Sequence, residues 1–296
     1  MVKELTQAVV EEFISLATGP FSTKDIWQTI GIVTPAGKTH LRVILGRLET
    51  KKIIVSVGHD GTYRRVQQDA PTINWQEADP NKTIDLVFPF EIENFVKVFP
   101  KSIIIVAGTK NSGKTAFLYN FIQMNMANFK IDLYNSETSP EQMHERFQPL
   151  DIPYPAPFEV FERYDNFADI IDPDKVSVID YLDVGSEVYM VGAEIDAIFR
   201  KLRQGVAVIA LQKPPPSVIF VRGVKKLIER DLAYGGAFTA KRAILYISLG
   251  SNQLKLLYVK TPRGHIDPNN MQFRYTVSKD GVHFENIRRY YEEDDH

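Results

Sequence analysis

The sequence predicts an α/β protein in which helices cover both faces of a mostly parallel sheet, with a small separate domain in front of it. Three observations predict this fold. From Ile84 onward, short apolar runs alternate with helix-like segments. Residues 108–115 read GTKNSGKT, between an apolar run and a helical pattern. The first 65 residues instead combine three helical patterns with one hairpin pattern.

The first segment has the spacing of a small helical domain that ends in a hairpin. Apolar residues recur at helical spacing in three stretches, which predicts helices over residues 6–17, 22–31 and 36–50. Ser22 is expected to cap the second helix and Gly31 to end it. Two strand-like runs, residues 53–57 and 62–66, flank a GHDG turn at residues 58–61 and predict a hairpin.

Three helices followed by a two-stranded wing resemble a winged helix-turn-helix domain. This resemblance implies that the third helix enters the major groove of DNA and that the wing contacts the DNA backbone. It implies DNA contacts for Lys38, His40, Arg42, Arg64 and Arg65. The alternative is a protein-interaction domain whose basic face is only solvated.

Composition limits the partners and the compartment. The net charge is −2, so attraction to nucleic acid would be local to the basic excess of residues 22–65. The absence of cysteine excludes disulfides and thiolate metal sites. The N-terminus lacks the apolar core of a signal peptide, and no stretch approaches about 18 uncharged apolar residues. We therefore expect a cytoplasmic protein that does not enter a membrane.

A polar, proline-marked stretch without periodicity divides the chain. It covers residues 69–83 and reads DAPTINWQEADPNKT, which is typical of a linker. The expected domains are therefore residues 1–68 and 84–296. Within the second domain, apolar runs predict strands at residues 103–107, 130–134, 176–180, 206–211, 243–249 and 254–259. The runs at residues 272–277 and 281–286 predict an antiparallel extension.

The GxxxxGKT motif predicts a phosphate-binding loop. Its glycines allow backbone N–H groups to curl around phosphate oxygens, and the helix that follows adds the positive end of its dipole. Lys114 would reach the β and γ phosphates, and the hydroxyl of Thr115 would bind Mg²⁺. The alternative is a glycine-rich turn with a solvated lysine. The expected ATP contacts are Gly108, Thr109, Lys110, Asn111, Ser112, Gly113, Lys114 and Thr115.

Two further segments resemble elements of RecA-superfamily ATPases, nearest to DnaB-like replicative helicases. Residues 133–143 read LYNSETSPEQM, similar to the strand-end SLEMS element, and residues 176–182 read VSVIDYL, similar to the Walker B strand. The resemblance implies that Glu137 is the general base for the attacking water. It implies that Asp180 holds Mg²⁺ through water, with Asp183 as the weaker candidate. The alternatives are a surface or capping role for the glutamate and a turn-capping role for the aspartate.

Gln212 directly follows the strand predicted at residues 206–211, in the position of that family's γ-phosphate sensor. The resemblance implies that Gln212 bonds to the phosphate and passes the nucleotide state to the loop behind it. In the alternative, the basic residues of that loop are the solvated face of a helix over residues 221–232. The expected contacts of the loop with single-stranded DNA are Lys213, Arg222, Lys225 and Lys226.

Residues 257–264, LYVKTPRG, resemble the strand end from which related ATPases reach into the site of a neighbouring subunit. This implies that Lys260 and Arg263 neutralise charge on the departing phosphate in trans. Pro262 makes the motif one residue longer than the helicase form.

The sequence thus predicts an ATP-hydrolysing, DNA-associated protein that uses Mg²⁺ and moves on or remodels nucleic acid as a homo-oligomeric ring or filament. The resemblance covers residues 84–286, and a winged helix stands where DnaB-like helicases have a different helical domain. The alternatives are a nucleotide-gated DNA-binding regulator with slow turnover and a recombinase-like or helicase-loader protein. A small-molecule kinase would need a lid and an acceptor pocket, for which the sequence shows no convincing counterpart.

Overall fold

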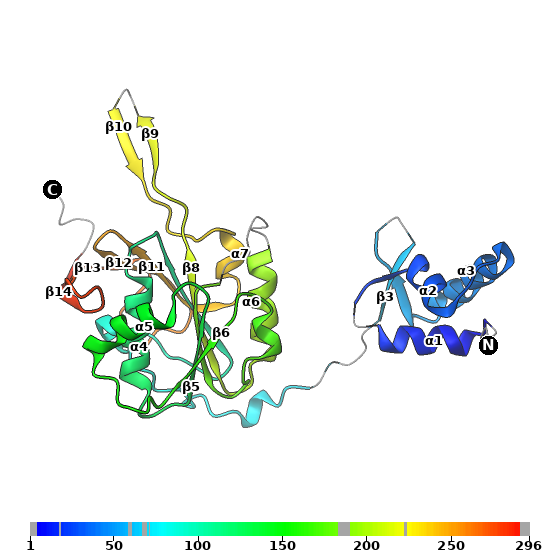
Figure 1. Ribbon diagram of the computed structural model, residues 1–296, viewed down its shortest axis with the longest axis horizontal. Coiled ribbons are helices and arrows are strands. Elements are labelled where there is room, and N and C mark those ends of the chain that lie inside the picture. The colour runs from blue at the N-terminus through cyan, green and yellow to red at the C-terminus, as the bar shows by residue number, and fades with distance from the viewer. Residues whose placement is uncertain are drawn as a thin grey trace. The chain divides into compact units, whose positions relative to one another are not determined.

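Figure 1 shows the protein as a computed structural model that describes residues 5–17, 19–58, 61–66, 70, 72–182, 190–221 and 224–290. The chain divides into two compact units, Met1–Ala78 and Asp79–His296. Their boundary falls inside the polar stretch of residues 69–83. Across the described residues, none of the helices combines the length and the apolar character needed to cross a membrane.

In the residues that the structure describes, the first unit combines three helices with a small antiparallel sheet. The helices are α1 (Gln7–Leu16), α2 (Thr23–Ile30) and α3 (Pro35–Thr50). The strands are β1 (Phe21–Ser22), β2 (Ile54–Ser56) and β3 (Thr62–Arg65), in the order β1-β3-β2. A 3₁₀ turn, η1 (Trp75–Glu77), follows near the end of the unit.

Local sequence signals set the helix ends in this unit. Oγ of Ser22 accepts the N–H of Asp25 at 3.2 Å, and the Asp25 carboxylate accepts the N–H of Ser22 at 2.7 Å, which is a capping box. Gly31 ends α2 with a φ of 78°. The helices and the sheet enclose a core made of Val10, Ile14, Phe21, Ile26, Leu41, Ile44, Leu45, Leu48 and Ile54.

Over its described residues, the second unit is built on a nine-stranded sheet with the order β14-β13-β12-β11-β4-β8-β7-β5-β6. The pairs from β11 to β6 are parallel, whereas the pairs that join β11, β12, β13 and β14 are antiparallel. The strands are β4 (Ser102–Gly108), β5 (Ile131–Asn135), β6 (Glu159–Glu162), β7 (Val176–Asp180), β8 (Val206–Gln212), β11 (Ala243–Gly250), β12 (Gln253–Val259), β13 (Met271–Val277) and β14 (Phe284–Tyr290).

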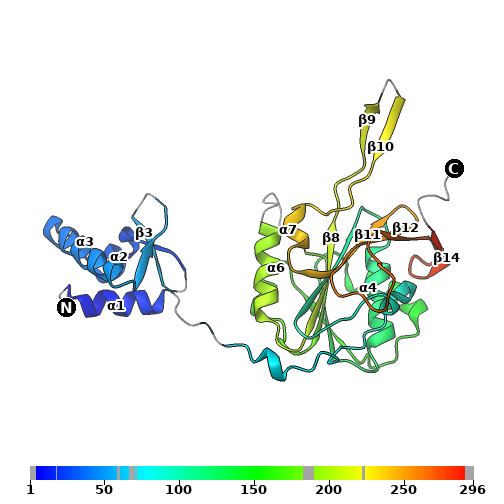
Figure 2. The same ribbon diagram turned by 180° about the vertical axis from the view of Figure 1, so that it is seen from behind.

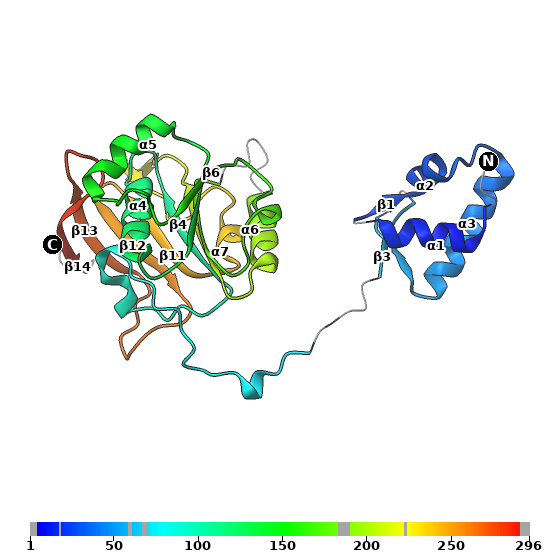
Figure 3. The ribbon, with the colours of Figure 1, turned by 60° about the horizontal axis from the view of Figure 1, so that its bottom comes forward.

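Helices cover both faces of this sheet (Figure 3). The α4 helix (Lys114–Asn125) and the α5 helix (Pro140–Phe147) lie on one face, and α6 (Met190–Lys201) and α7 (Ala237–Ala240) lie on the other. Alternate residues of β4 therefore enter two cores: Ile104 and Val106 pack with the α4 side, and Ile103 and Ile105 with the α6 side. The 3₁₀ turns of this unit are η2 (Pro89–Asn94), η3 (Gln148–Leu150) and η4 (Phe167–Asp169).

The prediction of an α/β fold with a mostly parallel sheet is confirmed, and so is the antiparallel extension at its end. The helix considered over residues 221–232 is wrong. Residues in that region form an antiparallel hairpin of β9 (Ser217–Val221) and β10 (Val224–Ile228), which stands out from the sheet in Figures 1 and 2. The segment is rich in valine, isoleucine and phenylalanine, which favour extended backbone over helix.

Candidate active site

The carboxyl ends of four parallel strands meet at one edge of the large sheet. Gly108 at the end of β4 pairs with Gln212 at the end of β8, and Asn135 at the end of β5 pairs with Asp180 at the end of β7. Because β7 and β8 are also neighbours, the sheet brings together four positions that lie far apart in the sequence. Ligands of open α/β sheets bind outside this edge.

The loop between β4 and α4 has a backbone that its glycines make possible. Gly113 has a φ of 90° and is the N-cap of α4, where no side chain caps the helix. A Cβ at Gly108 would lie 2.2 Å from Oγ of Ser112 and 2.8 Å from Cγ of Lys114. Asn111 has a φ of 61°, a region that asparagine tolerates better than most residues. The loop therefore presents uncapped N–H groups, as an anion-binding loop requires.

The other loop residues close it or face outward. The N–H and the Oγ of Ser112 both donate to the carbonyl oxygen of Thr109, at 3.3 and 2.9 Å. Lys110 is exposed. These contacts fix the width of the loop and leave Lys110 the most solvent-facing charge in it.

Lys114 lies across the inside of the loop. Its Nζ donates to the carbonyl oxygens of Gly108 and Thr109 at 3.2 and 3.0 Å, and to Oε1 of Gln212 at 3.1 Å. Burial lowers the pKa of Lys114, while the charges of Glu137 and Asp180 act in the opposite direction. The ammonium group is held by three uncharged acceptors, so an anion at this position would be a stronger partner.

Thr115 and Asp180 offer oxygen ligands for a divalent cation. Oγ1 of Thr115 lies 3.4 Å from Oδ1 of Asp180, whose side chain is fully buried. Within the described part of the chain, Oδ2 of Asp180 has no hydrogen-bond partner. Burial raises the pKa of Asp180 to about 6, against the effect of the Thr115 hydroxyl. A buried carboxylate oxygen without a donor, beside a threonine hydroxyl, fits the hard oxygen ligands that Mg²⁺ prefers.

Glu137 lies in the turn between β5 and α5, and its side chain is exposed. Its charge raises the pKa values of both Lys114 and Asp180. Asn135 shapes this turn, because its Oδ1 accepts the N–H of Thr138 at 3.1 Å and the Thr138 hydroxyl at 2.8 Å. Sequence analysis missed Asn135, although an asparagine directly after an apolar strand is a signal for such a side-chain turn.

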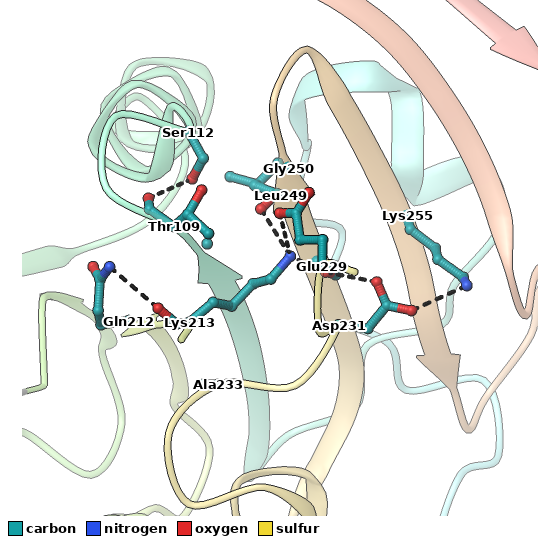
Figure 4. Close-up of polar contacts among 12 residues, drawn as sticks. Thr109, Ser112, Gln212, Lys213, Glu229, Asp231, Ala233, Leu249, Gly250 and Lys255 are labelled. Carbon is teal, nitrogen blue, oxygen red and sulfur yellow. Dashed lines mark hydrogen bonds and ion pairs between the residues drawn. The ribbon is translucent and has the colours of Figure 1, made fainter. Parts of the chain in front are cut away.

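Lys213 does not face nucleic acid, which corrects one expectation. The side chain is 1% exposed, and its Nζ bonds to Oε1 of Glu229 at 3.0 Å, Oγ of Ser248 at 3.0 Å and the carbonyl oxygen of Leu249 at 3.2 Å (Figure 4). Figure 4 also shows Asp231 between this group and Lys255. The lysine points into the sheet because Glu229, at the base of the β9–β10 hairpin, supplies its counter-charge.

The other basic residues that were expected to contact DNA are divided between the two units. In the first unit, Arg42 is exposed on α3, and Lys38 on the same helix is half-buried with Nζ 4.1 Å from the centre of the Trp27 ring. Arg64 and Arg65 are exposed on β3. In the second unit, Lys225 and Lys226 belong to β10. Their side chains lie outside the described residues, as do Arg222 and Asp183.

Lys260 and Arg263 lie at the other edge of the sheet. They follow β12, whose last residue pairs with Leu245 near the start of β11, whereas Gly108 pairs with Leu249 near its end. Lys260 donates to the carbonyl oxygen of Lys241 at 3.1 Å, and Nε of Arg263 donates to that of Val96 at 3.4 Å. Since β4 spans about 20 Å, neither side chain reaches the phosphate loop of its own chain.

The comparisons with known proteins bear only on the fold of this chain. No protein-family model matches the chain, and no curated protein matches its sequence. A structure of a DnaB-like replicative helicase in its interactions with primase aligns with 72% of this chain and 66% of its own, just under two thirds, at 13% identity and a TM-score of 0.50. The RadB recombinase crystal structure aligns with 65% of this chain and 94% of its own, at 14% identity and a TM-score of 0.43. The likeness to the helicase structure is one of α/β fold.

Proposed function

We propose that the protein binds ATP with Mg²⁺ at the carboxyl edge of the large sheet and hydrolyses it. The observation that supports this most directly is the convergence of Lys114, Thr115, Asp180 and Gln212 at one edge, with the charge of Glu137 acting on two of them. Each of these side chains has the chemistry that a phosphate-transfer site requires.

In this mechanism, Lys114 exchanges its carbonyl acceptors for the β and γ phosphates and neutralises their charge. Thr115 and Asp180 would hold Mg²⁺, which would draw charge from the phosphate oxygens when bound. Glu137 accepts a proton from the water as its oxygen bonds to the γ phosphorus, while the bond from that phosphorus to the β–γ bridging oxygen breaks and ADP leaves. Gln212, released by Lys114, bonds to the terminal phosphate. The chain supplies position and charge, which is most of what phosphate transfer needs from a protein.

We further propose that nucleic acid and a second copy of the chain are partners. In the first unit, taken as a winged helix of residues 1–68, the exposed arginines on α3 and β3 would contact DNA phosphates. In the second, residues 84–296, the β9–β10 hairpin carries two lysines away from the sheet. Lys260 and Arg263 would complete the site of a neighbouring copy, the role that the resemblance of residues 257–264 to related ATPases implies, since in their own chain they lie at the edge opposite the phosphate loop.

The test is ATP turnover measured with and without single-stranded DNA, double-stranded DNA and RNA, over a range of protein concentrations. Turnover that rises steeply with concentration and is stimulated by DNA would support the proposal. A Lys114→Ala variant should bind and hydrolyse far less ATP while its thermal unfolding stays close to that of the parent. Full hydrolysis by this folded variant would overturn the mechanism. Nucleotide-dependent DNA binding with negligible turnover would instead favour a nucleotide-gated DNA-binding regulator.

A further inference from the structure

A buried tyrosine from the C-terminal part of the sheet contacts the phosphate loop. Tyr275, in β13, is 2% exposed, and its Oη donates to the carbonyl oxygen of Ser112 at 2.8 Å. The carbonyl oxygen of Gly250, at the end of β11, lies 3.4 Å from the same Oη. Burial raises the pKa of Tyr275 well above its ordinary value, so the hydroxyl keeps its proton in neutral solution. Its shorter hydrogen bond is the one to the loop.

Aromatic packing fixes the position of this hydroxyl. The ring of Tyr275 lies 5.2 Å from that of Phe90 and 5.1 Å from that of Phe284, and both pairs have edge-to-face geometry. The Phe284 ring also lies against Gly113, where an added Cβ would come within 3.4 Å of Cε1. The β13–β14 hairpin therefore supports the phosphate loop from outside.

A second bond ties the same hairpin to the helix that follows the loop. Nδ2 of Asn120, in α4, donates to the carbonyl oxygen of Val282 at 2.8 Å and to that of Ala116 at 2.8 Å. Since Val282 lies in the turn between β13 and β14, the hairpin, the loop and α4 hold one another in place.

The bond to Ser112 has a directional consequence. In a planar trans peptide, the carbonyl oxygen and the N–H of the next residue point in opposite directions. A Ser112 carbonyl held toward β13 therefore points the N–H of Gly113 to the opposite side of the peptide, away from the hairpin. This N–H belongs to the N-cap of α4 and is one of the donors that a phosphate oxygen would use.

We propose that Tyr275 is a positioning residue for nucleotide binding, which orients the Ser112–Gly113 peptide so that its N–H faces the β-phosphate. This inference rests on the proposed function, since it names a further residue of the same site. No motif predicts it, because the contact joins residues that are 163 positions apart in the chain.

The test is Tyr275→Phe in the full chain, titrated calorimetrically with ADP and ATP in the presence of magnesium. The substitution keeps the ring between Phe90 and Phe284 and removes only the donor. Without this restraint on the Ser112–Gly113 peptide, the protein is expected to bind both nucleotides about tenfold more weakly. In steady-state assays, the KM for ATP should rise by a similar factor with little change in kcat, because the lost interaction acts equally on bound substrate and transition state.

Tyr246→Phe is the matched control. Oη of Tyr246 is also buried and lies 2.9 Å from the N–H of Ala233 and 3.0 Å from Oγ1 of Thr239, on the face of the sheet that α6 covers. This variant should lose similar stability and keep parent-like affinity. Parent-like affinity in Tyr275→Phe, or equal weakening in both variants, would overturn the positioning role alone. A parent protein that binds neither nucleotide would overturn the proposed function together with it.

Discussion

Nζ of Lys114 and Oε1 of Gln212 lie 3.1 Å apart, so the first residue of α4 is bonded to the last residue of β8 across 98 positions of the chain. The two side chains share one bond that a phosphate would compete for. If Lys114 turned to an anion, Oε1 of Gln212 would lose this donor, while Nε2 would still donate to the carbonyl oxygen of Lys213 at 3.4 Å. The residue that follows Gln212 is the buried Lys213, whose ion pair reaches the base of the hairpin.

We expect Gln212→Ala to separate binding from hydrolysis. The variant should bind ADP with parent-like affinity, because Lys114 keeps the acceptors of Gly108 and Thr109. Its turnover should fall about a hundredfold, since a donor to the transferred phosphate is lost. Single-turnover hydrolysis and ADP titration measure the two effects. An equal loss of ADP affinity would show that Gln212 shapes the loop rather than contacting the terminal phosphate.

The pH dependence of stability should report the buried carboxylate of Asp180. Burial raises its pKa from 3.8 to about 6. The folded state therefore holds this proton more tightly than the unfolded state, and metal-free protein should lose about 2 kcal/mol of stability as the pH rises from 4 to 7. Urea unfolding in the presence of a chelator measures this loss, and magnesium should reverse part of it at pH 7.

Asp180→Asn is the control for that titration, since the amide cannot ionise. Other groups titrate in both proteins, so the difference between the two stability profiles isolates Asp180. The variant should be the more stable of the two at pH 7 without magnesium, and magnesium should not stabilise it. Profiles that remain parallel between pH 4 and 7 would show that this carboxylate does not carry the proton.

The Lys213–Glu229 pair should contribute to stability more than its partial exposure suggests. Glu229→Gln leaves the buried ammonium without a counter-charge, and Glu229 is itself 33% exposed in its side chain. We expect a loss of about 1 to 3 kcal/mol, less than for a fully buried pair. Asp174→Asn, in an exposed pair with Arg203, should cost less than about 1 kcal/mol. Equal losses in chemical denaturation would contradict this ranking.

Mixing two inactive variants tests the contribution of a neighbouring copy. Arg263→Ala keeps an intact phosphate loop, whereas Lys114→Ala keeps an intact Arg263. If Arg263 acts between copies, the mixture should recover a fraction of the parent turnover, and each variant alone at the same total concentration should not. Absence of recovery at every mixing ratio would assign Arg263 to its local contacts with Val96 and Asp85.

The sequence predicted the parts of the fold that have strong local signals. The strand expected at residues 176–180 coincides with β7, and that at residues 206–211 lies within β8, because buried parallel strands are continuous apolar runs. The short β6 was not predicted, since all four of its residues are exposed at the edge of the sheet and its two apolar residues are adjacent rather than alternating. Helix ends followed their caps, as at Ser22.

The site residues that belong to a single motif could be predicted from the sequence. Residues whose contacts depend on distant segments of the chain could not. Gly108, Lys114 and Thr115 are adjacent to one another in the fold as in the motif. Lys213 was misassigned, because a lysine before three prolines has the local pattern of a solvated loop. Its counter-charge, Glu229, directly follows the second strand of a hairpin that the sequence did not predict.

Lys260 and Arg263 lie at the opposite edge of the sheet from Gly108, so the number of completed sites depends on how the copies assemble. In the proposed arrangement, the edge of one copy meets the opposite edge of the next, so the contact is heterologous and repeats with a constant rotation. A row with free ends always leaves one terminal copy without a donor, whereas a closed circle leaves none. Short rows would therefore contain the largest fraction of incomplete sites. Closing a row into a ring would complete the last site.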